Sequence, residues 1–131
     1  MRVTRIATGA DGETHFSDFD IPLSDAGSIG RLSDIVPATG VVFRETPADY
    51  DYDWHPAPRR QYIVLLDGHI EITVGDGETR RFSGGDVLLV EGNTRVSNAI
   101  KYLTQSTWSH AAHYIGDALV KNRKDPDPPV L

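Results

Sequence analysis

Three histidines are the side chains of this 131-residue chain best suited to chemistry: His55, His110 and His113. An unperturbed imidazole titrates near pH ~6.5, so it can both take and give a proton near neutrality. The chain contains no cysteine, which excludes thiolate nucleophiles, thiolate metal ligands and disulfides. These residue types therefore allow acid/base chemistry or metal binding by histidine.

His55 is followed closely by side chains that could hold a ligand. Arg59 and Arg60 carry planar guanidinium groups that suit an anion, and Gln61 and Tyr62 come next. We expect Arg59, Gln61 and Tyr62 to bind a small polar or anionic ligand. His55 is then either a passive group, hydrogen-bonded to solvent or backbone, or a metal-free acid/base. The alternative is that at least one arginine is a surface charge on a strand edge.

His110 and His113 are three residues apart. On a helix this spacing puts two side chains on one face, where they could chelate a metal; on a strand it puts them on opposite faces. The choice depends on Trp108–Ile115, an apolar segment that fits either a strand or a helix.

Short strands must position most of these groups, because the apolar segments before Glu91 are brief and interrupted by turn residues. Ile70, Ile72 and Val74 alternate with polar residues, which predicts one buried face. Several short strands at this spacing are typical of a sandwich or barrel. The predicted strands are Val3–Ile6, Ile21–Leu23, Ile35–Val36, Val41–Phe43, Tyr62–Leu66, His69–Val74, Thr79–Phe82 and Val87–Val90, with Tyr62–Leu66 buried on both faces.

The apolar period changes after Glu91. Val96, Ile100 and Leu103 fall at the spacing of one helix face, so residues 96–103 are predicted to form a short C-terminal helix. The last segment, Lys121–Leu131, holds three of the eight prolines and is expected to be an extended or disordered tail.

Residues 54–68, WHPAPRRQYIVLLDG, resemble the first motif of the cupins, and Gly85-Asp86 resembles the start of their second motif. Over roughly residues 38–91 the resemblance implies a mainly β protein built as an antiparallel β-barrel. Many cupins hold one divalent metal with two histidines and a glutamate from the first motif and a histidine from the second. By this resemblance His55 matches the first histidine, whereas Ala57 and Gln61 stand at the next two ligand positions.

Residues 85–116 resemble a second family, the permuted papain-like cysteine amidases related to the NlpC-type hydrolases. The segments GDVLLVEG and TQSTWSH carry this resemblance. It implies that His110 corresponds to the base that deprotonates a catalytic cysteine. It also implies that Trp108–Ile115 is a strand, so that His110 and His113 face opposite ways. Because the chain has no cysteine, it cannot hydrolyse amides by that mechanism.

The two resemblances meet at residues 85–91, a segment that is a strand in both families. We therefore expect a chimera, with residues 1–91 as a cupin-like barrel portion and residues 92–131 as a fragment of the amidase. Such a barrel would be incomplete or patched, and exposed strand edges recruit partners. A homodimer that pairs edge to edge, or aggregation, is the expected outcome.

Composition narrows the function further. The net charge of -6 argues against a nucleic-acid partner. The absence of an apolar run of ~18–20 residues argues against a membrane span, and the N-terminus lacks the apolar region of a signal peptide, so a cytoplasmic protein is expected. We expect a cupin-like protein that is non-catalytic or binds a small ligand, with a degenerate metal site. The alternatives are a metal-free isomerase or cyclase that uses His55, and an inactive truncated amidase.

The count of ligands predicts no tightly bound metal and no cofactor. Of the first-motif ligands only His55 remains, and catalytic metal sites generally use about three protein ligands. Elemental analysis of the protein purified without chelator should find well under one metal ion per chain. A stoichiometric ion bound at His55 would contradict this prediction.

Overall fold

The computed structural model describes residues 1–48, 51–55, 59–91, 100–104 and 109–115. Of residues 51–55, 100–104, 109 and 115 it describes the backbone alone. The described chain is mainly β, with one short 3-10 helix, η1 (Gly27–Ile29). No helix in these ranges has the length and apolar character needed to cross a membrane.

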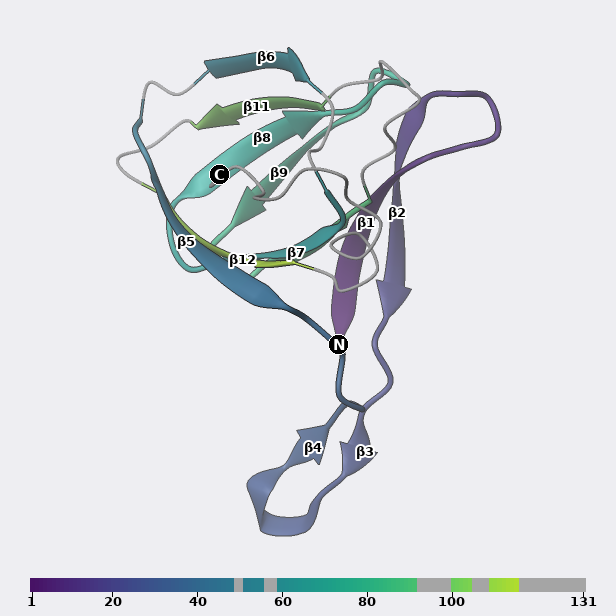
Figure 1. Ribbon diagram of the computed structural model, residues 1–131, viewed down its shortest axis with the longest axis vertical. Coiled ribbons are helices and arrows are strands. Elements are labelled where there is room, and N and C mark those ends of the chain that lie inside the picture. The colour runs from purple at the N-terminus through teal and green to yellow at the C-terminus, as the bar shows by residue number, and fades with distance from the viewer. Residues whose placement is uncertain (49–50, 56–58, 92–99, 105–108, 116–131) are drawn as a thin grey trace.

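Two sheets form the body of the protein (Figure 1). The six-stranded sheet contains, in order, β2 (Thr14–Asp20), β1 (Arg2–Thr8), β10 (Val87–Val90), β7 (Gln61–Leu65), β12 (Ser109–Ile115) and β5 (Gly40–Thr46). The four-stranded sheet contains β6 (Asp51–His55), β11 (Ile100–Thr104), β8 (His69–Thr73) and β9 (Thr79–Ser83). A separate hairpin pairs β3 (Ser24–Asp25) with β4 (Arg31–Leu32).

The chain changes sheet at almost every connection from β5 to β12, and within that run only β8 and β9 are neighbours both in sequence and in one sheet. The order β5-β12-β7-β10 therefore faces β6-β11-β8-β9, with every pairing among these eight strands antiparallel. Interleaving of this kind is the jelly-roll architecture that cupins share. The fold is thus cupin-like, and no ladder between described strands joins the two sheets into a closed barrel.

The core lies where the two sheets face each other. Ile63 and Leu65 of β7 pack in one cluster with Ile70 and Ile72 of β8. The predicted alternation on β8 is confirmed, because Ile70, Ile72 and Val74 are each 0% exposed. The other members of the cluster are Ile6, Phe16, Val74, Phe82, Leu88, Val90 and Ala111.

The prediction that Tyr62–Leu66 is buried on both faces is wrong at Leu66, which is 55% exposed. The strand ends at Leu65, and the backbone there turns toward Gly68, whose φ of 68° marks the bend. Tyr62 and Val64 are half-buried on the face opposite the core. An apolar run therefore does not mean equal burial of both faces.

Part of the N-terminal prediction is also wrong. Residues 21–23 and 35–36 are not strands. The polar segment Thr14–Asp20 forms β2 instead, and it pairs with β1 along its whole length. Only Thr14 and Phe16 of β2 are buried. Pairing with β1, rather than local apolar character, defines this strand.

The predicted helix over residues 96–103 is not formed at residues 100–103, which belong to β11; residues 96–99 lie outside the described ranges. β11 lies between β6 and β8 and pairs with both. Pairing on two sides satisfies the backbone donors and acceptors, and it outweighs the weak helix preference of a short segment. The prediction that Trp108–Ile115 is extended is confirmed for residues 109–115, while Trp108 lies outside the described residues.

The C-terminal segment supplies an internal strand to each sheet. β11 lies inside the four-stranded sheet, and β12 lies between β5 and β7 in the other (Figure 1). The sequence analysis predicts a barrel that is incomplete or patched after residue 91. β11 and β12 fill internal positions of the two sheets. The pairings describe packing and not ancestry, so the division into residues 1–91 and 92–131 stays a prediction.

Adjacent leucines provide a test of the core. Leu65 is 1% exposed and Leu66 is 55% exposed. Leu65→Ala should lower the free energy of unfolding by ~2–5 kcal/mol, since it empties a packed site. Leu66→Ala should change it by less than ~1 kcal/mol. Urea unfolding of the two variants measures both effects, and equal losses would show that the face assignment of β7 is wrong.

Candidate functional site

A buried polar pair interrupts the apolar face of the six-stranded sheet. Gln61 begins β7 and is 4% exposed, and His113 lies in β12 and is 2% exposed. The register pairs His113 with Ile63 and Gln61 with Ile115, so both side chains lie on the core face. His113 Nδ1 and Gln61 Oε1 are 3.0 Å apart.

The partner of His113 determines which ring nitrogen carries the proton. An amide oxygen can only accept, so His113 Nδ1–H is the donor in this hydrogen bond. Nε2 is then an unprotonated acceptor; it is buried and has no hydrogen-bond partner among the described residues. Burial lowers the pKa of His113 to about 4, with a further contribution from the positive charge of Arg44. The ring is therefore neutral at pH 7 and presents a lone pair inside the protein.

Two arginines accompany the pair. Arg59, two residues before Gln61, is 3% exposed. Arg44 is half-buried on β5, and its positive charge helps to lower the pKa of His113. Buried guanidinium groups are rare unless they have anionic or hydrogen-bonding partners, and both arginines do make interactions in this structure. The positive charges of the two arginines suit an anionic molecule. The unprotonated Nε2 of His113 suits a molecule that also carries a hydrogen-bond donor.

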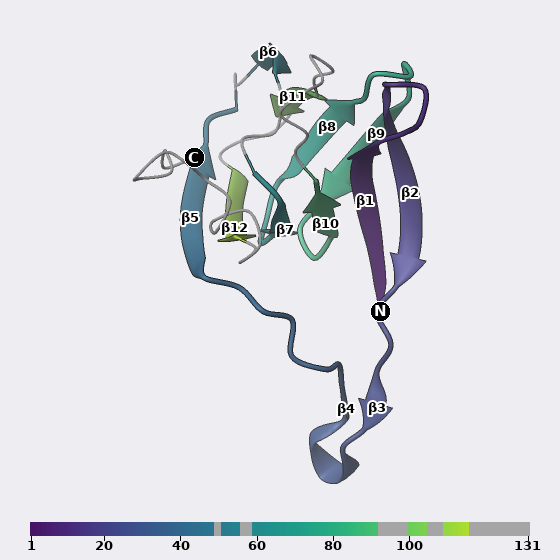
Figure 2. The ribbon, with the colours of Figure 1, turned by 45° about the vertical axis from the view of Figure 1, so that its right-hand side comes forward.

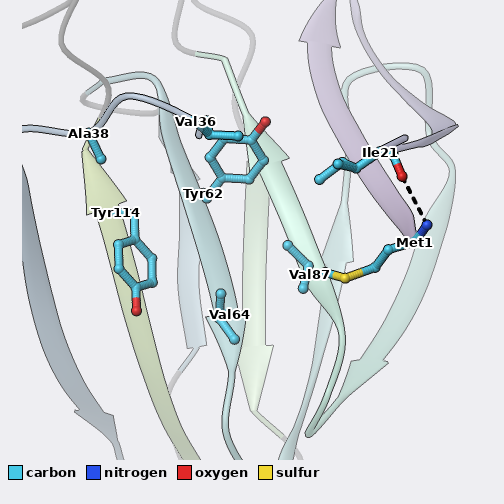
Figure 3. Close-up of a pocket in the computed structure, with 8 residues that line it drawn as sticks. All are labelled: Met1, Ile21, Val36, Ala38, Tyr62, Val64, Val87 and Tyr114. Atoms are coloured by element: carbon cyan, nitrogen blue, oxygen red, sulfur yellow. Dashed lines mark hydrogen bonds between the residues drawn. The ribbon is translucent and has the colours of Figure 1, made fainter. Parts of the chain in front are cut away.

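The structure separates some of the residues predicted to act together. Gln61 and Tyr62 are neighbours on β7 and therefore face opposite ways. Gln61 is buried, whereas Tyr62 lines an apolar groove on the outer face of the sheet (Figure 3). His55 is on β6, in the other sheet, where its backbone pairs with Ile100; its side chain is outside the described part of the structure.

His110 lies on the outer face of β12, as the strand reading of the two histidines predicts. Its Nδ1 is 2.8 Å from Asp67 Oδ2, and its Nε2 is 3.2 Å from Glu45 Oε1. The hydrogen bond with Asp67, and then that with Glu45, raises the pKa of His110. The imidazole lies between two carboxylates, and the interactions with them favour its protonated form. That His110 is catalytically idle stays a prediction.

The described residues contain no group of three or more histidine, aspartate or glutamate side chains arranged to hold a metal ion. His15, which contacts two carboxylates, shows why. Its two ring nitrogens point at different carboxylates, Nδ1 at Asp76 (2.8 Å) and Nε2 at Asp11 (2.7 Å). These groups bracket the imidazole from opposite sides and do not converge on one point.

The sequence predictions did not include His113 as the partner of Gln61, or Arg44 as its neighbour. The local pattern does not single out His113, because Ala111 and Ala112 are both apolar and lie on opposite faces of the strand. The partner could not be found in this way, because the pairing of β12 with β7 joins segments far apart in the sequence.

Comparison with known proteins finds no matching protein family and no matching curated sequence. Three solved structures are similar in shape. An RmlC-like cupin family protein with a double-stranded β-helix fold from Methanocaldococcus jannaschii has a TM-score of 0.49 and 12% identity, over 58% of this chain and 67% of that one. A candidate ethanolamine utilization protein Q from Salmonella typhimurium has a TM-score of 0.47 and 17% identity, over 90% and 97%. A protein from Neisseria meningitidis has a TM-score of 0.46 and 17% identity, over 63% and 81%.

The buried histidine makes stability depend on pH. Between the pKa of an unfolded histidine, ~6.5, and that of folded His113, about 4, the unfolded chain binds more protons. Stability is therefore complete above pH ~6.5 and falls as the pH drops, by about 3 kcal/mol near pH 4. Urea unfolding should show His113→Gln losing less stability than the wild type between pH 7 and 4.5.

The matched control is His110→Gln, because the pKa of His110 is shifted upward. This variant should keep the whole acid-induced loss that the wild type shows. If His113→Gln and the wild type lost equal stability on acidification, His113 would not be buried and neutral.

Proposed function

We propose that this cupin-like protein binds a small anionic ligand on the core face of the six-stranded sheet, without chemistry of its own. The observation that carries the proposal is the buried Gln61–His113 pair, whose Nε2 acceptor meets no partner in the part of the chain that the structure describes. An unsatisfied buried acceptor costs ~1–3 kcal/mol, and a ligand that supplies a donor removes this cost. We propose the cytoplasm as its location.

The chemistry of the cluster favours a hydroxy acid. Positive charge from Arg44 reaches His113, and Arg59 lies buried beside the start of β7, so a carboxylate is attracted to this region. The lone pair on His113 Nε2 accepts a hydrogen bond from a hydroxyl. The same lone pair discriminates against an acid that lacks the hydroxyl, because the acceptor then stays buried and unpaired.

Matched pairs of acids test the proposal by isothermal titration calorimetry. Lactate should bind at least ~10-fold more tightly than propionate, and malate at least ~10-fold more tightly than succinate, given the cost of an unpaired acceptor. Gln61→Glu should weaken malate binding by ~10-fold or more, since it places a carboxylate beside the ligand. Tyr62→Phe is the control: it alters the opposite face and should change affinity less than twofold.

Two results would count against the proposal. Equal affinity for the hydroxylated and unhydroxylated acids would show that Nε2 is not a recognition element. Loss of binding in Tyr62→Phe but not in Gln61→Glu would move the site to the outer face.

A metal-free isomerase or cyclase that uses His55 as an acid/base is our second proposal. The observation in its favour is that β6, which carries His55, belongs to the sheet that faces β7 and β12. His113 does not suit this role, because a pKa of about 4 lies far from the operating pH that favours a general base. Recovery of the ligand unchanged after incubation with the protein distinguishes binding from catalysis.

We keep the descent of residues 85–131 from a permuted papain-like amidase as a proposal on ancestry. Since the chain has no cysteine, such a segment would be an inactive remnant of that enzyme that now serves as sheet strands. An edge-to-edge homodimer also stays a proposal, with β2, β5, β6 and β9 as the sheet edges that the structure describes.

A further inference from the structure

One part of the chain stands away from both sheets. We call residues 24–36 the arm: it contains β3, η1 and β4 and projects from the body in both views (Figures 1 and 2). Every residue from 27 to 41 is exposed. Among them Ile29 is 71% exposed, Leu32 53% and Ile35 93%. The arm therefore carries large apolar side chains into solvent.

The arm makes too few contacts within itself to be stable alone. Its ladder pairs Ser24 with Leu32 and Asp25 with Arg31, and β3 and β4 have two residues each. An isolated two-stranded hairpin is marginal in water even when it is longer. Ordered packing of its apolar residues needs a second surface, and the described part of the body leaves them exposed.

A suitable surface lies on the outer face of the six-stranded sheet. We call it the groove: a hollow of about 230 Å³ lined by Met1, Ile21, Val36, Ala38, Tyr62, Val64, Val87 and Tyr114 (Figure 3). The register explains its apolar floor, because Tyr114 pairs with Tyr62 and Val87 pairs with Val64, all directed away from the core. Tyr114 is 42% exposed, so the floor is open.

We propose that two copies of this chain form a symmetric dimer in which each arm lies over the partner's groove, with Ile29, Leu32 and Ile35 as the contacts. Val36, the last residue of the arm, lines the groove of its own chain, so the arm and the groove are adjacent. A two-fold axis near Val36 would place the arm of each chain over the groove of the other chain. An interface of this kind is self-complementary, as a two-fold dimer requires.

The size of the surface supports a stable dimer. Residues 27–41 form one continuous exposed stretch, and the groove adds six residues outside that stretch. Together they approach the ~20–30 residues a side of a standard protein interface. The two tyrosines are of the type enriched at such interfaces. This inference is independent of the ligand proposal, because Tyr62 and Gln61 lie on opposite faces of β7.

Sedimentation velocity tests the dimer. The wild-type chain should be a dimer at micromolar concentration. The variant with Ile29→Ser, Leu32→Ser and Ile35→Ser should be monomeric, with a dissociation constant raised at least tenfold and an unchanged far-ultraviolet circular dichroism spectrum. Leu66→Ser is the matched control: it removes an apolar side chain that is 55% exposed but outside the arm and groove, and it should remain dimeric.

Cysteine pairing tests the geometry, since the natural chain has no cysteine. A mixture of Ile35→Cys and Tyr114→Cys chains, oxidised together, should give a disulfide-linked dimer that contains one chain of each kind. A chain with both substitutions should form linked dimers and not an internal disulfide.

Three outcomes would overturn the proposal. The first is a wild-type chain that stays monomeric at 100 μM. The second is an arm variant that stays dimeric, which would favour pairing through a sheet edge. The third is an internal disulfide in the doubly substituted chain, which would place the arm on its own groove.

Discussion

β12 fills the space between β5 and β7, and its seven residues pair with β5 along their whole length and with β7 over five positions. Among the described strands, β12 is the sole neighbour of β5 in its sheet. The backbone groups of β5, β7 and β12 must find partners, because unpaired buried amides and carbonyls are costly. A strand in this position therefore joins the middle of the chain to its C-terminal part, and the core between the sheets depends on it.

β12 also places His110 and His113 on opposite faces of the sheet. Adjacent strand positions alternate between faces, so three residues of separation place His113 on the core face and His110 outside. Burial lowers the pKa of His113, and hydrogen bonds that the His110 ring donates to Asp67 and Glu45 raise the pKa of His110. The pKa values of two identical side chains thus shift in opposite directions, and the inner ring is the harder one to protonate.

The sequence predicts the local features well and the distant ones poorly. The alternation of Ile70, Ile72 and Val74 follows from residue types alone. The strand β11 does not, since its local apolar spacing favours a helix and only pairing with β6 and β8 makes it extended. For the site, Gln61 and Arg59 are found in the sequence as candidates, but His113 joins them through a contact between strands that no local pattern reveals.

The parallel pairing of β1 with β10 brings Thr4 beside Leu88 and Ile6 beside Val90. The partner of β1 therefore lies far along the chain from it, and the same is true of β5 and β12. Closing such long loops is slow, because the entropy of the connecting chain is lost before the contacts form. In the interval β1 and β2 can exist only as a hairpin with Val3 and Ile6 uncovered. Misassembly is therefore most probable before β10 has paired with β1, and a chaperone that shields this hairpin would raise the yield of folded protein.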